Sequence, residues 1–141
     1  MNKRFGPPSV LLAIAAGAML GTLLRYSINV AAFDSIFPFG TLVENWSGSA
    51  LLGALTGFFA IFTVREWISA GLGVGLCGGY TTFSTLVSDT VLLGSALSPL
   101  YIAAYILPTI VGGIAFAWAG FAGAQRLGRK LRSSERGGRR L

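Results

Sequence analysis

The sequence contains no histidine, and its 141 residues include a single cysteine. Without histidine, the chain lacks the side chain that proteins most often use as a general base and as a metal ligand. Cys77 cannot form a disulfide within the chain, and its apolar neighbours predict a buried, inert thiol. These absences disfavour acid–base catalysis and a transition-metal site.

Charged residues are also scarce, at 11% of the chain, and only five residues are acidic. Hydrophobic residues make up 53% and the mean hydropathy is +0.69, which lies outside the range of ordinary soluble proteins. Four apolar segments are each long enough for a bilayer core that needs about 20 residues. They span residues 10–33, 40–64, 67–97 and 99–126. The sequence therefore predicts an all-α membrane protein with four transmembrane helices.

These segments predict a short cytoplasmic N-terminus at residues 1–9, a four-helix transmembrane domain at 10–126 and a basic cytoplasmic tail at 127–141. With four spans, the N-terminus, the middle loop and the tail share one side, which holds all the Lys and Arg residues except Arg25. The positive-inside rule then predicts a multi-pass protein of a bacterial-type inner membrane with both termini in the cytoplasm. The tail fits an anionic lipid bilayer better than it fits nucleic acid.

The third segment contains the least helix-like sequence. Gly78 and Gly79 permit backbone angles that a helix does not use, and five Ser or Thr residues follow by position 88. Broken polar backbone at bilayer depth is tolerated only where it is buried in protein or lines a watery cavity. We expect a third helix that is broken at Gly78–Gly79. The alternative is a glycine kink whose hydroxyl side chains bond back to their own helix.

Polar and small side chains recur every fourth residue in the second and fourth segments, which places each set on one helical face. These sets are Thr41, Asn45, Ser49 and Gly53 in the second segment, and Tyr105, Thr109 and Gly113 in the fourth. They offer amide and hydroxyl donors with little negative charge, and donors without acids suit an anion better than a cation. The electropositive ring edge of Phe83 could also meet a small anion.

The first segment repeats small residues at the same spacing, at Ala13, Gly17 and Gly21, which predicts close helix packing. Arg25 continues this face. A cation within a span faces either the bundle interior or the interface near the helix end. Glu44, in the second segment, is an ionisable group of the kind that often marks a functional site, although it also lies close enough to the helix end to reach the interface.

The sequence shows no nucleophile–base pair and no phosphate-binding loop, so we expect no enzymatic activity. A proton-coupled small multidrug-type exporter has the same size and number of spans, and Glu44 could serve as its carrier acid. This exporter remains an alternative to an anion channel.

Three strings carry a resemblance to a known family: GAMLGTLLRY at 17–26, GTLVEN at 40–45 followed by Gly48-Ser49, and GGYTTFST at 78–85. In order along the chain, they resemble the Fluc (CrcB-type) fluoride channels. The resemblance implies a four-helix subunit that pairs as an antiparallel dimer. It also implies passive, fluoride-selective export that lowers the toxicity of fluoride in the cytoplasm and confers fluoride resistance.

The resemblance assigns five side chains to the anion pathway: Asn45, Phe83, Tyr105, Thr109 and Arg25. Asn45 would be the pore amide and Phe83 the pore aromatic residue. It also implies a structural sodium ion that is not transported and lies at the centre of the dimer. The backbone carbonyls of Gly78 and Thr81 would hold this ion.

Three positions depart from the family pattern. Leu86 replaces a second phenylalanine, Glu44 replaces an apolar residue, and Pro108 interrupts the stripe of the fourth helix. A homodimer would therefore lack one of two aromatic residues in each pore. Together with the biased charge, this predicts an antiparallel dimer with an oppositely oriented paralogue. A non-conducting partner subunit of a heterodimeric channel is the remaining alternative.

Overall fold

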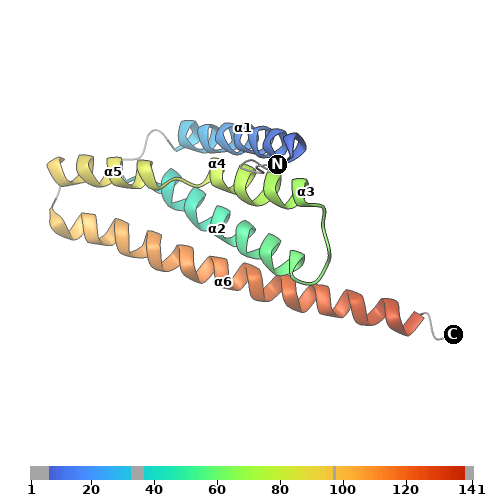
Figure 1. Cartoon of the computed structure of the whole chain (residues 1–141). Helices are drawn as coiled ribbons and strands as arrows, with labels where there is room; N and C mark the ends of the chain where they lie inside the picture. The colour runs from blue at the N-terminus through green and yellow to red at the C-terminus, as the bar shows by residue number, and fades with distance from the viewer. Residues whose placement is uncertain (1–6, 33–36, 97, 139–141) are drawn as a thin grey trace.

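The computed structural model describes residues 7–32, 37–96 and 98–138, which contain helices and no strand (Figure 1). The predicted N-terminal residues 1–6, the predicted span ends at Phe33 and Leu97, and tail residues 139–141 lie outside this described part.

Three continuous helices, α1 (Pro8–Ala31), α2 (Phe39–Phe59) and α6 (Pro99–Gly138), correspond to the first, second and fourth apolar segments. Each begins at a proline or directly after one, since the first helical turn does not need the N–H group that proline lacks. Two of them, α1 and residues Pro99–Ser133 of α6, are long and apolar enough to cross a membrane. The prediction of an all-α membrane protein is thus confirmed.

The third apolar segment is divided into four pieces: α3 (Glu66–Ala70), the π-helix η1 (Gly71–Cys77), α4 (Gly78–Tyr80) and α5 (Phe83–Ala96). They follow one another along a single line, with α1 on one side of it and α2 and α6 on the other (Figure 1). The main contacts of α1 are with η1, and those of α2 are with α6. The broken segment therefore lies between α1 on one side and α2 and α6 on the other (Figure 1).

Small residues allow the helices to approach closely. A methyl group at Gly17 or Gly21 of α1 would collide with the backbone of the third segment at Gly71 or Leu76. This confirms the predicted packing stripe on the first helix. A methyl group at Gly53 of α2 would likewise collide with the backbone of α6.

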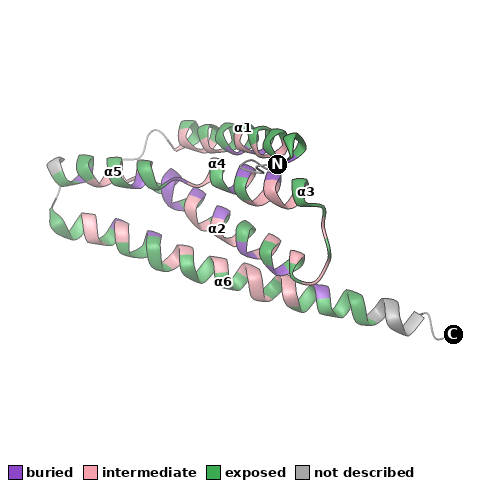
Figure 2. Cartoon of the chain, viewed as in Figure 1, coloured by how far each residue is buried: buried purple, intermediate pink, exposed green. Residues whose placement is uncertain are grey.

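Exposed residues run along the helices (Figure 2), and many of them are large and apolar. Leu12 of α1 and Trp118 of α6, for example, are each 70% exposed. Among the residues that the structure describes, a small cluster of Leu86, Leu93 and Tyr105 forms a buried apolar core between α5 and α6. A chain with this distribution needs lipid or another protein chain around it.

Candidate functional site

The third helix is broken at Thr81–Thr82, so the predicted break at Gly78–Gly79 is wrong. Helix α4 ends at Tyr80, Thr81 is extended with φ −79° and ψ 155°, and α5 begins at Phe83. Gly78 has helical angles, and no glycine in the described ranges has a positive φ. Gly79 provides space instead, because a methyl group there would lie 2.5 Å from the carbonyl oxygen of Ala18 on α1.

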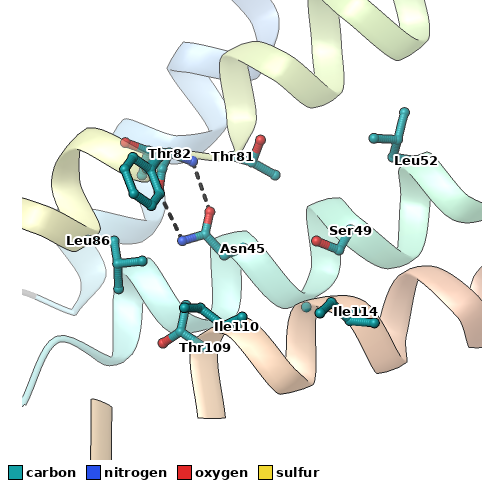
Figure 3. A pocket seen from close by; sticks show the side chains of 11 residues that line it. Asn45, Ser49, Leu52, Thr81, Thr82, Leu86, Thr109, Ile110 and Ile114 are labelled. Carbon is teal, nitrogen blue, oxygen red and sulfur yellow. Dashed lines mark hydrogen bonds between the residues drawn. The ribbon is translucent and has the colours of Figure 1, made fainter. Parts of the chain in front are cut away.

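Asn45 of α2 bonds the broken backbone at Thr82. Its Nδ2 donates to the carbonyl oxygen of Thr82 at 3.0 Å, and its Oδ1 accepts from the N–H of Thr82 at 2.8 Å (Figure 3). One side-chain amide thus pairs with both the N–H and the carbonyl of Thr82 at the break. The second N–H of Asn45 Nδ2 is not used in these two hydrogen bonds.

Hydroxyl side chains also bond backbone groups at the break. The Oγ1 of Thr82 accepts from the N–H of Thr85 at 3.1 Å, which is the bond that an N-cap residue makes to the first turn of its helix. Thr81 donates from its N–H and from its Oγ1 to the carbonyl of Cys77, each at 2.9 Å. The alternative prediction of hydroxyls that bond back to their own helix is therefore confirmed for Thr81.

An open cavity of about 330 Å³ lies beside the break, between α2, α5 and α6 (Figure 3). Its lining includes the predicted site residues Asn45, Phe83 and Thr109, with polar atoms added by Ser49 and Thr82. All the residues that line it are uncharged. The cavity thus combines amide and hydroxyl groups with apolar walls and contains no fixed charge.

Phe83 and Leu86 both line this cavity, but the structure places them differently. Phe83 is 75% exposed, whereas Leu86 is 6% exposed and belongs to the buried core. Leu86, where the resemblance leads us to expect a second phenylalanine, is thus packed in the core, and Phe83, the predicted pore aromatic residue, projects outward.

Tyr105 belongs to a second polar cluster, centred on Asp89 of α5. The Oδ2 of Asp89 accepts from Tyr105 Oη at 2.7 Å and from Thr41 Oγ1 at 2.8 Å, and both donors are buried. Sequence reasoning did not place Asp89 in the site. The signal was present, since an acidic residue inside an apolar segment one turn after Thr85 marks a functional position.

The stripe on the fourth helix continues past Pro108. Helix α6 is continuous through this proline, and Tyr105 and Thr109, on either side of it, are both buried. Thr109 Oγ1 donates to the carbonyl of Tyr105 at 2.6 Å. The predicted interruption is therefore wrong, because the side chains of the two stripe residues stay aligned one turn apart. The carbonyl of Pro108 instead accepts from the indole N–H of Trp46 at 2.9 Å.

Arg25 is half-buried on α1 and does not line the cavity. Gly78 also lies away from it, at an exposed position where a methyl group would meet no atom within 4 Å. In a continuous helix the N–H of Thr82 would bond the carbonyl of Gly78, but it bonds Asn45 instead. Backbone carbonyls at such a helix end suit a hard cation, so Gly78 and Thr81 fit the implied sodium ion.

Comparison with known proteins gives a consistent result. Residues 12–121 match the family model described as "CrcB-like protein, Camphor Resistance (CrcB)". The chain is 44% identical over 117 residues to "Fluoride-specific ion channel FluC 2" of Halalkalibacterium halodurans, covering 83% of this chain and 87% of that protein. It is also 44% identical over 118 residues to the Bacillus subtilis protein of the same name, covering 82% and 87%. The "Fluoride-specific ion channel FluC" of Nitrobacter winogradskyi is 38% identical over 114 residues, covering 78% and 90%.

Proposed function

The chain belongs to the CrcB family, and from this membership we propose that it is a subunit of a passive, fluoride-selective channel. Relatives named fluoride-specific ion channels match it over most of both chains, which favours a channel rather than an enzyme. Fluoride would leave the cytoplasm down its electrochemical gradient, and its toxicity there would fall.

The observation that carries this proposal is the uncharged cavity at the helix break. Asn45 of α2, Thr82 of the break and Thr109 of α6 converge there from three elements. Fluoride must exchange its hydration shell for other hydrogen-bond donors, and the second N–H of Asn45 and the hydroxyl of Ser49 can supply them. The exposed ring of Phe83 offers its positive edge at the same place. Tyr105 and Arg25 would extend the path beyond the cavity.

Two features support a second chain beside this one. Phe83, Val87 and Val91 give α5 an exposed apolar face, each side chain being 47% exposed or more. An apolar cavity of about 220 Å³ adjoins this face between α5 and α6. A partner that covered both would enclose the cavity at the break. Since the chain's cations gather on one side, an oppositely oriented paralogue in an antiparallel dimer fits best.

A structural sodium ion at the centre of this dimer would bind the carbonyls of Gly78 and Thr81. The support is that Gly78 faces open space and that the helical partner of its carbonyl is bonded elsewhere. The ion would join the two chains without being transported. The melting temperature of the purified protein should then be higher in sodium than in N-methylglucamine at equal ionic strength. Equal melting temperatures would contradict the site.

The membrane arrangement follows from the same features. Four transmembrane helices with both termini in the cytoplasm would place the basic end of α6 against the anionic leaflet of the inner membrane. Helix α2 has 21 residues, which at about 1.5 Å per residue reaches across the hydrocarbon core. The interrupted third segment would cross with its break buried against Asn45.

Liposomes loaded with potassium fluoride test the proposal. A passive channel carries charge, so fluoride efflux should start only when a potassium ionophore supplies the balancing current. A fluoride electrode follows the release, and liposomes without protein are the control. Efflux that proceeds equally without the ionophore would indicate an exchanger and contradict the proposal.

A further inference from the structure

Glu44 is the most unusual side chain of α2. Its exposed fraction is 0%, and neither carboxylate oxygen has a hydrogen-bond partner in the described part of the chain. A buried carboxylate without a partner is costly when it carries its charge, because it gives up its hydration and gains nothing in return. The structure therefore requires something to neutralise Glu44.

The donors nearby are already engaged. Thr41, one turn earlier on α2, and Tyr105 of α6 both donate to Asp89 rather than to Glu44. Arg25 of α1 and Asp89 of α5 act on Glu44 electrostatically, but Arg25 does not bond either of its oxygens.

The other helices that contact α2 add no charge to this region. The titratable groups of η1 and α4 are Cys77 and Tyr80, and both types are neutral at physiological pH. The hydroxyl of Tyr80 is paired with Ser47 at 2.8 Å. With Glu44 ionised, the cluster of Arg25, Glu44 and Asp89 carries one cation and two anions, so one further positive charge would balance it.

Three carriers could supply that charge: a side chain of another protein chain, a metal cation, or a proton. A partner's side chain cannot reach a carboxylate that is 0% exposed. A metal cation needs several ligands at once, and the described residues contain no group of three acidic or thiol side chains that could hold one. A proton needs one oxygen and no cavity.

We propose that Glu44 is a proton-binding site and that its neutral form is the conducting form of the channel. A proton from bulk water adds to one carboxylate oxygen and gives a buried carboxylic acid that balances the charge of the cluster. This inference rests on the proposed fluoride channel and adds control by acidity to it. It assigns a role to a position where the family resemblance leads us to expect an apolar residue.

The effect on transport follows from the position of Glu44 directly before Asn45. When Glu44 loses its proton, a negative charge appears beside the anion path in a poorly screened environment. One unit charge about 10 Å away, at an effective dielectric constant of about 20, lowers the occupancy of an anion site roughly tenfold. Fluoride flux should therefore rise as the pH falls.

The test compares fluoride efflux from liposomes at about pH 5.5 and about pH 8.5, a range in which carboxyl groups with raised proton affinity titrate. The wild-type chain should conduct roughly tenfold faster at the acidic end. Glu44→Gln and Glu44→Val should conduct at the acidic rate throughout, and the second variant needs no polar partner. Glu66→Gln, which changes an exposed residue at the start of α3, is the matched control and should keep the wild-type pH profile.

Arg25→Gln gives a directional test, since a nearby cation favours the charged carboxylate. Removing it should move the pH profile to higher pH. Infrared difference spectra measure the protonation of Glu44 independently of transport. A carbonyl band of a protonated carboxylic acid should appear on acidification and be absent in Glu44→Gln.

Three results would overturn the proposal. The first is a pH profile in Glu44→Gln and Glu44→Val that matches the wild type. The second is an infrared spectrum that does not change in Glu44→Gln. The third is a rate that depends on the identity of the metal cation at constant pH, which would show that a metal rather than a proton neutralises Glu44. If no fluoride flux were seen at any pH, the proposed channel function would be wrong. The infrared result would still decide whether Glu44 binds a proton.

Discussion

At the scale of single residues, Asn45 links α2 to the broken helix through two hydrogen bonds to the backbone of Thr82. The same amide lines the uncharged cavity. It therefore holds the break in place and leaves one N–H for the proposed anion. A change at this position should affect both roles.

Asn45→Asp should abolish fluoride throughput. The aspartate keeps an acceptor for the N–H of Thr82, but it places an oxygen against the carbonyl of Thr82 and a negative charge at the cavity. Fluoride efflux from liposomes measures the loss. Asn29→Asp is the control, because within the described ranges Asn29 bonds a carbonyl of its own helix and does not line the cavity. Wild-type efflux in Asn45→Asp would remove Asn45 from the pathway.

Sequence reasoning predicted Asn45, Phe83 and Thr109, which the structure brings to one cavity. Their motifs and four-residue spacing place each of them on a helix face. The bonding partners of Asp89 and the enclosure of Glu44 could not be predicted, because both depend on how α2, α5 and α6 are aligned against one another. Spacing within one helix contains no information on that alignment.

At the scale of the elements, the helices were predictable and the details of the third segment were not. The apolar lengths predicted four helices, and the adjacent glycines and hydroxyl residues of the third segment predicted that its helix is broken. Adjacent glycines can allow either an unusual backbone conformation or a close contact between helices, and the sequence does not distinguish these two possibilities. In the structure Gly79 serves a contact with α1, while Asn45 and Thr82 stabilise the break. The π-helix η1 was also not predicted.

The contact between Gly79 and α1 can be tested by its effect on stability. Gly79→Ala should lower the free energy of unfolding by about 1–3 kcal/mol, because the added methyl group would overlap the carbonyl of Ala18. Gly123→Ala on α6 is the matched control, since a methyl group there would meet no atom within 4 Å. Denaturation in detergent measures both variants. If the two variants were equally stable, the close approach of α1 and α4 would be wrong.

At the scale of the whole molecule, α6 is longer than a membrane requires. Its 40 residues extend about 60 Å at 1.5 Å per residue, against a hydrocarbon core of about 30 Å. The C-terminal part of this helix carries Arg126, Arg129, Lys130 and Arg132. We therefore expect it to project from the bilayer with its positive charge.

This charge should fix one orientation. Each cation near an anionic surface contributes about 1 kcal/mol, so the cations of α6 together favour one orientation by far more than tenfold. A tag at the C-terminus should be labelled from the cytoplasmic side alone. Replacing the four cations at positions 126, 129, 130 and 132 together with the other cations of the same side, at positions 3, 4, 65, 136, 139 and 140, with glutamine should give a mixture of orientations. Equal labelling of the wild-type tail from both sides would contradict the expected need for an oppositely oriented partner.

The most direct measurement of the central claim is the ratio of fluoride to chloride conductance. The purified chain, alone and together with an oppositely oriented relative, is placed in planar bilayers with fluoride on one side and chloride on the other. An uncharged cavity of amide and hydroxyl donors should give a reversal potential close to that of fluoride, with the larger current in the paired sample. A reversal potential that shows chloride and fluoride to be equally permeant would contradict the account.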